Sequence, residues 1–277
     1  MTLSLSQRSK RLFSKGLPPV ILITGASRGL GRGIAVHAAQ EGFSAVINYA
    51  TQSRAAEDAV QECRSRQIDD SQQFLAIRAD IGSPGGRKKL VEGTLKTFGR
   101  IDALINNAGI GPEIRIDVTE VSEKSFRRVL EVNLAGPHFL TQRVANYWLH
   151  KKPVPFLPSG FTVIFISSIS AEMLSLDRSE YCISKAGLSM ASQIWAARLG
   201  AAGVNVVELR PGIMATDMTS RVKEKYEKLF ADGTVPQQRW GTADDVGKAA
   251  AAILKGSFPF SAGSVIHIDG GIHLKRL

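Results

Sequence analysis

Residues 20–33 read Val-Ile-Leu-Ile-Thr-Gly-Ala-Ser-Arg-Gly-Leu-Gly-Arg-Gly, and this stretch decides the fold. Val20 to Ile23 is an apolar run too short for a helix and bounded by glycine, which predicts a buried strand. Three glycines follow, at Gly25, Gly29 and Gly31. Glycines permit a tight turn whose backbone N–H groups come close to a pyrophosphate at a helix N-terminus. With a helix from about Gly31 to Gly42, the stretch indicates a dinucleotide site, although ordinary β–α turns share this pattern.

The length and composition of the chain favour one large α/β domain. Its 277 residues can bury a sizeable core, and no run of about 18 apolar residues could span a membrane. Cys63 and Cys182 fit no metal spacing and are expected to be reduced thiols, which suits a cytoplasmic protein. The five histidines form no ligand pattern, so no metal is expected. We place the domain at residues 19–277.

Residues 1–18 are expected to form a flexible basic tail. They contain four basic residues, several serines and no acid, and they lack the apolar region of a secretory signal. A transit peptide has a similar composition. The formal charge of the whole chain is +10, which attracts anionic partners. No nucleic-acid-binding motif accompanies this charge, so we expect a solvated basic surface, with an anionic substrate or an acidic carrier protein as the alternative.

Strands and helices are predicted to alternate along the rest of the chain. This order predicts a doubly wound parallel sheet with helices on both faces. The expected strands are residues 45–49, 74–79, 103–105, 161–166, 204–209 and 264–268. The expected helices are residues 54–66, 83–98, 122–148, 179–199, 221–230 and 243–255, with Ser53 as the cap of the first. Polar residues follow several strands, and such residues meet at the carboxyl edge of a parallel sheet, where ligands bind.

Tyr181 and Lys185 are four residues apart on a predicted helix and therefore share a face. A phenol has an ordinary pKa of about 10. A cation at roughly 4 Å contributes about 4 kcal/mol at an effective dielectric constant of about 20, which would lower that pKa by about three pH units. A phenol tuned in this way can exchange a proton near pH 7. Alone, the Tyr-x-x-x-Lys spacing is common among surface residues.

The pair occurs in the company of several further motifs, in a fixed order along the chain. These are Thr24-Gly25-x-x-x-Gly29-x-Gly31, Asn106-Asn107-Ala108-Gly109, Asn133, Ser168 thirteen residues before Tyr181, and Pro211-Gly212. The set resembles the short-chain dehydrogenase/reductase family from about residue 18 to the end. Residues 181–190 and 210–218 look most like those of 3-oxoacyl-[acyl-carrier-protein] reductases. The resemblance implies a single-domain Rossmann fold and an NAD(P)-dependent oxidoreductase.

The resemblance also implies catalytic roles. Tyr181 would be the general acid in carbonyl reduction, and Lys185 would lower its pKa and hold the nicotinamide ribose. Ser168 would hydrogen-bond the substrate oxygen and stabilise the charge that develops there. Asn133 would position a water that links Lys185 to solvent, unless it only braces the sheet.

Cofactor contacts follow from the same resemblance. The turn would hold the pyrophosphate through Gly25, Ser27, Arg28, Gly29, Leu30 and Gly31. Asp80 and Ile81 would contact the adenine, although Asp80 could be an ordinary turn residue. Asn107, followed by Ala108 and Gly109, would lie near the adenine ribose. Pro211, Gly212, Met214 and Thr216 would surround the nicotinamide, with Met214 and Thr216 on its amide.

The end of the second strand predicts NADP(H) over NAD(H). An acid about 20 residues past the glycines would bind the ribose 2′-hydroxyl and repel a 2′-phosphate. Here the strand ends at Asn48 and Tyr49 with no carboxylate, and we include both residues in the cofactor site. Arg28 inside the glycine turn could pair with the phosphate.

The substrate is the least readable part of the sequence. Residues 217–234 lie where the family places a mobile substrate lid, and three lysines there could meet an anion, although a solvated charged helix shares this composition. Carrier-protein reductases present basic residues near the site, and Lys151 and Lys152 are candidates. Ala202 stands where a second basic residue is frequent, and the connector at residues 151–160 is long. Both departures weaken the expectation of an acyl-carrier partner.

Several function classes therefore remain. The first is reduction of a 3-oxoacyl thioester, the second is oxidation or reduction of a small sugar, polyol or cyclic alcohol, and the third is a non-catalytic NADP-binding regulator. No nucleic-acid or membrane partner is expected. The resemblance further suggests a homotetramer, assembled through the helices that carry Asn133 and Tyr181 and through the last strand and helix. Apolar residues around Leu188 and Ile194 permit such an interface.

Overall fold

A seven-stranded, wholly parallel sheet forms the centre of the protein, in a computed structural model that describes residues 17–217 and 223–275. The strand order is β3-β2-β1-β4-β5-β6-β7. The strands are β1 (Val20–Ile23), β2 (Ser44–Tyr49), β3 (Phe74–Arg78), β4 (Ala103–Asn106), β5 (Phe161–Ile166), β6 (Val204–Pro211) and β7 (Val265–Ile268). The predicted doubly wound α/β fold is confirmed. The tail predicted at residues 1–18 lies almost entirely outside the described residues.

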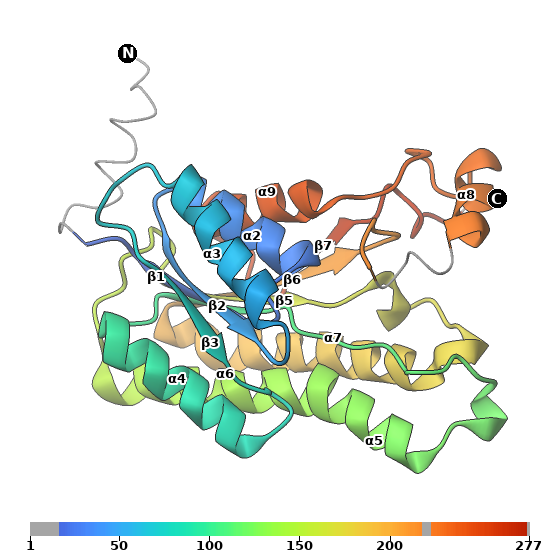
Figure 1. The fold of residues 1–277 in the computed structure, drawn as a ribbon, viewed down its shortest axis with the longest axis horizontal. Helices are drawn as coiled ribbons and strands as arrows, with labels where there is room; N and C mark the ends of the chain where they lie inside the picture. Colours follow the sequence, from blue (N-terminus) through green and yellow to red (C-terminus); the bar gives the residue numbers. More distant parts are fainter. Residues whose placement is uncertain (1–16, 218–222, 276–277) are drawn as a thin grey trace.

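Helices cover both faces of the sheet, as Figure 1 shows, with α2, α3 and α9 on one face and α4 to α7 on the other. Their bounds are α2 (Gly29–Gln40), α3 (Ser53–Arg66), α4 (Pro84–Phe98), α5 (Glu123–Leu130), α6 (Gly136–Lys151), α7 (Ser179–Leu199), α8 (Lys223–Ala231) and α9 (Ala243–Leu254). Alternate residues of the central strands enter two separate cores, so that Ile21 and Ile23 face α2 while Leu22 faces the α6 side. Burial on both faces explains why these strands are continuous apolar runs.

Helix ends differ from the predictions where local capping decides. The Ser83 hydroxyl caps α4 by accepting from the Gly86 N–H at 3.0 Å. The prediction that Ser53 caps α3 is wrong, because Ser53 is the first helical residue and Gln52 precedes it without a side-chain cap. Helix α2 begins two residues earlier than predicted, inside the glycine turn itself.

The long helix predicted at residues 122–148 contains one irregular turn. Helix α5 runs into a π-helical turn at Glu131–Ala135, which continues into α6. Pro137 has no N–H to donate to the carbonyl of Asn133, and its ring crowds that carbonyl, so the regular hydrogen-bond ladder cannot pass this point. Such widened turns are frequent at functional sites. This one holds Asn133, whose side chain is completely buried.

Two further features of the described residues bear on function. None of the helices in residues 17–217 and 223–275 is both long and apolar enough to cross a bilayer. The same residues contain no group of three or more histidine, cysteine or acidic side chains arranged for a metal. Cys63 is buried and its pKa is raised to about 12, chiefly by burial, so this thiol is chemically inert at neutral pH.

Candidate active site

A cavity of about 1080 Å³ lies at the carboxyl ends of the strands. It collects nearly all of the predicted site residues. The glycine turn, the ends of β2 and β3, the Asn107 loop, the end of β5, the start of α7 and the loop after β6 all line it. Two predicted residues do not line it: Gly31 and Asn133 stand behind the wall. The sheet topology therefore brings residues 25 to 216 to one edge, where a parallel α/β sheet binds its ligands.

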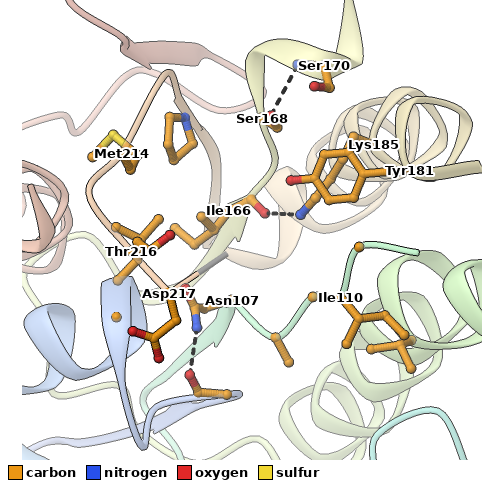
Figure 2. A pocket seen from close by; sticks show the side chains of 18 of the residues that line it. Asn107, Ile110, Ile166, Ser168, Ser170, Tyr181, Lys185, Met214, Thr216 and Asp217 are labelled. Carbon is orange, nitrogen blue, oxygen red and sulfur yellow. Dashed lines mark hydrogen bonds between the residues drawn. The ribbon is translucent and has the colours of Figure 1, made fainter. Parts of the chain in front are cut away.

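The glycine turn is shaped by close backbone contact with the loop after β4. Gly25 has a φ of 60°, and a Cβ there would lie 2.8 Å from the Cα of Ala108. The Asn107 amide donates to the carbonyls of Thr24 and Gly25 at 2.8 and 3.0 Å, and Figure 2 shows Asn107 among the residues that line the cavity. A Cβ on Gly31 would lie 2.5 Å from that amide nitrogen. Asn107 thus braces the turn, and Gly31 makes room for the brace.

Helix α2 begins in this turn without a side-chain cap at its N-terminus. Arg28 precedes the helix and makes no capping hydrogen bond, so the first backbone N–H groups remain available at the pocket wall. Uncapped N–H groups and the positive end of the helix dipole suit a phosphate. The Arg28 guanidinium instead forms an ion pair with Asp217 at 2.8 Å, and both side chains are exposed. This pair joins the glycine turn to the loop after β6.

The ends of β2 and β3 place two polar side chains whose hydrogen bonds are largely satisfied within the protein. Asn48 accepts from the Gly25 N–H at 3.3 Å and donates to the Ala79 carbonyl at 2.9 Å, which ties the turn to both strands. Asp80 accepts from the Gly82 N–H and pairs with Arg128, each at 2.9 Å. Both residues line the cavity. Asn48 therefore shapes this end of the cavity more than it offers free hydrogen-bonding groups.

Ser168, Tyr181 and Lys185 converge at the other end of the cavity. Ser168 follows β5, and the two others lie one turn apart on α7 (Figure 2). The Ser168 hydroxyl lies close enough to the Tyr181 hydroxyl to lower its pKa, and it accepts from the Ser170 N–H at 3.1 Å. The Lys185 ammonium donates to the Ile166 carbonyl at 3.0 Å and lies 5.7 Å from the Tyr181 ring centroid. A hydroxyl pair and a cation thus share one small region of the wall.

The lowered pKa that the spacing predicted for Tyr181 is not found in this structure, because burial outweighs the charges around the phenol. Burial raises the pKa of Tyr181 above its ordinary value, while the hydrogen bond with Ser168 and the nearby Arg178 and Arg115 oppose that rise. Burial also lowers the pKa of Lys185 to about 8, with Glu208 opposing. Spacing alone indicated the pair but could not weigh the desolvation of both groups. At neutral pH the phenol carries its proton.

Asn133 is a brace in this structure. Its amide oxygen accepts from the Ile110 N–H at 2.8 Å, and its nitrogen donates to the Ile110 carbonyl and the Ser184 hydroxyl at 2.9 and 3.0 Å. It thereby fixes the loop after Gly109 to α7. A Cβ on Gly109 would lie 3.4 Å from both the Asn133 oxygen and the Lys185 nitrogen, so the two side chains flank one backbone position.

The substrate side of the cavity contains residues that the sequence did not single out. They come from the loop before α5, the segment between β5 and α7, helix α8 and the C-terminal segment: Arg115, Met173, Leu174, Arg178, Tyr226, Leu229 and Ile272. For helix α8 the sequence left open a lid whose lysines meet an anion and a solvated charged helix; the structure adds that Phe230 is buried with Ile213 and Val235 in a small core beside Trp240. Residues 218–222 of the predicted lid lie outside the described residues, as do the side chains of Lys223 and Lys225.

The prediction that Lys151 and Lys152 flank the site mouth is wrong. They end α6, where the Trp148 indole donates to the carbonyl of Ile101 at the amino end of β4. This is the edge of the sheet opposite the cavity, which neither lysine lines. The error arose because α6 runs antiparallel to the strands, so that only its N-terminal end approaches the site.

A buried ionic network supports the wall behind Lys185. Glu208 of β6 is fully buried and accepts from Arg210 at 2.9 Å, from Ser189 at 2.8 Å and from the Ser167 hydroxyl. Arg210 also donates to Ser189 at 2.9 Å and pairs with Glu172 at the surface. Serines from the end of β5 and from α7 thus meet at one carboxylate. No motif in the sequence predicted this network.

Comparisons with known proteins agree with this architecture. A family model described as Enoyl-(Acyl carrier protein) reductase matches residues 25–273. A crystal structure of a 3-oxoacyl-[acyl-carrier protein] reductase from Brucella melitensis, in complex with NAD, is 38% identical, with a TM-score of 0.87 over 94% of this chain and 99% of that chain. A 3-oxoacyl-[acyl-carrier-protein] reductase from Synechocystis sp. is 30% identical over 91% of this chain and 96% of its own. An L-rhamnose 1-dehydrogenase (NAD(P)(+)) from Sphingomonas sp. is 27% identical over 92% and 96%.

The parallel sheet and the matches together define an oxidoreductase with a Rossmann-like fold. Within that class, the chain belongs to the short-chain dehydrogenase/reductase family, as the motif order predicted. Relatives named for 3-oxoacyl-carrier reduction and for sugar oxidation both lie at modest identity. Family membership therefore establishes the class of enzyme and leaves the substrate to the site.

Proposed function

We propose that this protein is an NADPH-dependent carbonyl reductase whose first candidate substrate is a 3-oxoacyl thioester, reduced to the 3-hydroxyacyl form. The observation that carries the proposal is the convergence of Ser168, Tyr181 and Lys185 on one end of a cavity whose other end is the glycine turn. The relatives named 3-oxoacyl-[acyl-carrier-protein] reductases support the substrate class. An acyl carrier protein is the corresponding partner, although the basic residues expected to receive it face away from the cavity.

In the proposed reaction, Tyr181 is the general acid. Its buried phenol is protonated at neutral pH, so it has a proton to give to the alkoxide that forms when a hydride reaches the carbonyl carbon. Ser168 donates a second hydrogen bond to the same oxygen. Lys185, held on the Ile166 carbonyl, supplies a cation beside Tyr181 below its pKa of about 8. Asn133 keeps the Ile110 loop and α7 in register rather than touching substrate.

The residues at the glycine turn fit a dinucleotide. The uncapped N-terminus of α2 suits the pyrophosphate, and Gly25 and Gly31 leave room for the Ala108 and Asn107 contacts that shape the turn around it. Asp80, Ile81 and Asn107 would border the adenosine half, and Pro211, Gly212, Met214 and Thr216 the nicotinamide half. A bound dihydronicotinamide would supply the hydride that adds to the carbonyl carbon.

Arg28 is proposed to select NADPH by pairing with its 2′-phosphate, in competition with Asp217. Arg28→Ala is expected to raise the KM for NADPH about 10-fold or more, as loss of a charge-assisted hydrogen bond predicts, and to change the KM for NADH little. Steady-state rates with both cofactors test this. Arg32→Ala is the matched control, because Arg32 pairs with Glu62 outside the cavity. An equal effect of Arg28→Ala on both cofactors would remove Arg28 from the phosphate site.

Asp217→Asn provides the complementary test. Removing the carboxylate that holds Arg28 is expected to lower the KM for NADPH, because the guanidinium no longer has to leave an ion pair before it binds phosphate. A higher KM would mean that Asp217 orders Arg28 for the cofactor instead of competing with it.

The second candidate function is dehydrogenation of a small sugar, polyol or cyclic alcohol, which the rhamnose dehydrogenase relative supports. With NADPH, acetoacetyl thioester is expected to be turned over at least 10-fold faster, measured as kcat/KM, than polyols are with NADP⁺, because a pocket lined by Met173 and Leu174 favours an apolar acyl group. The opposite ranking would favour the second candidate. Tight NADPH binding without turnover of any carbonyl would support a redox-sensing regulator.

The assembly is proposed to be a homotetramer. Helix α7 exposes Ile183, Met190 and Ile194 on one face, and α6 exposes Phe139, which provides an apolar surface for a second copy. Leu188, expected to belong to this surface, is instead buried within the chain. Light scattering of the purified protein measures the state directly.

A further inference from the structure

Arg178 and Arg115 form a cationic corner of the cavity that carbonyl reduction leaves unexplained. Both line the cavity beside Tyr181. The Arg178 guanidinium carbon lies 5.2 Å from the Tyr181 ring centroid. Arg115 pairs loosely with Asp177, with 3.4 Å between nitrogen and oxygen. Both cations act on the Tyr181 hydroxyl strongly enough to oppose the effect of burial on its pKa.

The hydrogen bonds of Arg178 are incomplete. One Nη donates to the Ser170 hydroxyl at 3.1 Å, while Nε is buried and has no acceptor. Arg178 pairs with no carboxylate among residues 17–217 and 223–275. A guanidinium has five N–H donors, and leaving one buried without an acceptor costs free energy. The Nε is enclosed, so a ligand in the cavity would meet the Nη atoms of Arg178.

The surrounding acids do not neutralise this corner. Asp177 is engaged by Arg115 and by the Ser175 hydroxyl. Glu180 is buried, but one of its oxygens accepts from Ser125 at 2.7 Å, which directs the carboxylate toward α5. Glu113 lines the cavity as an exposed side chain. The corner beside the phenol therefore keeps one guanidinium, that of Arg178, without a carboxylate partner among the described residues, next to the place where the carbonyl would react.

We propose that Arg178, assisted by Arg115, binds a carboxylate of the substrate, so that the compound reduced at Tyr181 is an oxo acid with its carboxylate a few bonds from the carbonyl. Arginine is suited to this role because its planar fork matches a carboxylate in a bidentate manner. The inference rests on the proposed carbonyl reduction and narrows its substrate. A thioester would place no charge here, so an acyl group that satisfies the corner carries its own carboxylate, and a sugar that does so is a sugar acid.

Acetoacetate and its ethyl ester test the proposal, because they share a ketone and differ in one charge. With NADPH, the wild type is expected to favour acetoacetate at least 10-fold in kcat/KM, and Arg178→Gln to lower that value about 100-fold while the ester changes less than about threefold. Arg178→Lys should restore part of the loss. Arg198→Gln, which removes an exposed charge from the C-terminal end of α7, is the matched control and should change neither value.

A binding measurement separates this inference from the proposed function. Malonate, added to the protein alone, is expected to raise the Tm of the wild type and of Arg198→Gln but not of Arg178→Gln. If no carbonyl compound is turned over but malonate shows this pattern, the reductase proposal fails and the anion site stands. If turnover occurs with equal preference for acid and ester, or if Arg178→Gln weakens both equally, the anion site is overturned. A malonate shift that survives in Arg178→Gln overturns it as well.

Discussion

Replacing Tyr181 with phenylalanine is expected to lower kcat for carbonyl reduction about 1000-fold, since a positioned general acid typically contributes between about 10²- and 10⁴-fold. The change removes one oxygen atom and keeps the ring that packs at the start of α7. Ser168 then has no phenol to orient, and the alkoxide must take its proton from water. The expected loss is in kcat with little change in the affinity for NADPH, measured by steady-state kinetics and by fluorescence titration of the cofactor.

Tyr147→Phe is the matched control for this prediction. Tyr147 lies on α6, and its hydroxyl donates to the Gly99 carbonyl at 3.3 Å, on the far side of the sheet from the cavity. Removing that hydroxyl is expected to leave kcat within about twofold of the wild type, as a surface substitution away from the site should. A Tyr181→Phe variant that kept most of its rate would end the assignment of Tyr181 as the acid and would direct attention to Ser168.

In the proposed reaction, the raised pKa of Tyr181 favours the protonated phenol that carbonyl reduction uses. Reduction needs the phenol protonated, and burial keeps it so through neutral pH. Oxidation of an alcohol by the same residue needs the phenolate, which burial disfavours. The site in this form is therefore better prepared to reduce a carbonyl than to oxidise an alcohol, and the reverse reaction is expected to gain rate as the pH rises.

Much of the fold could be predicted because local patterns and tertiary structure agree. The strands are continuous apolar runs. The strand at residues 161–166 and the helix at residues 179–199 have the bounds that the sequence predicted. The glycine turn, Asn107, Ser168 and Tyr181 lie at one sheet edge because parallel topology requires it. Errors appeared where a single contact decides how a helix begins or continues. Ser53 does not cap α3, although it stands at the start of that helix. At the π-helical turn, Pro137 interrupts the hydrogen-bond ladder of a helix whose sequence pattern is otherwise regular.

The rest of the site depends on contacts between side chains that the spacing of residues along the sequence does not reveal. Arg178 lies three residues before Tyr181 in the sequence, but the lack of an acceptor for its Nε becomes visible only when its neighbours are placed. Lys151 and Lys152 were assigned to the mouth from their position after a helix, without knowledge of which end that helix presents. Glu208 and Arg210 interrupt an apolar strand with two charges, and that interruption is a signal that could have pointed to a buried ion pair.

Replacing Glu208 with glutamine is expected to lower the free energy of unfolding by about 3 kcal/mol, because removing one partner of a buried ion pair leaves the other charge uncompensated. Arg210 is only 4% exposed and Glu208 is fully buried, so water cannot take the place of the lost carboxylate. The remaining partner of Arg210, Glu172, lies mostly in solvent. Urea denaturation measures the loss. Glu123→Gln is the matched control, since it breaks an exposed pair with Arg127 that should contribute less than about 1 kcal/mol.

A double substitution separates the charge from the shape. Glu208→Leu with Arg210→Met removes both ions together, and buried pairs replaced by apolar residues are frequently tolerated. The double variant is therefore expected to be less destabilised than the sum of its two single variants, with a coupling of about 1–3 kcal/mol. Strict additivity would mean that the two side chains act independently and that the short Arg210–Glu208 contact contributes little.

Glu208 contributes both to the stability of the fold and to the cavity wall behind Lys185. Its carboxylate holds Ser167, the neighbour of Ser168, and Ser189, one turn from Lys185 on α7. It also opposes the burial that lowers the pKa of Lys185 to about 8. Glu208→Gln should therefore lower that pKa further, and the alkaline fall of the reduction rate that follows loss of the Lys185 charge should move to lower pH. A destabilised variant with an unmoved pH profile would confine Glu208 to a structural role.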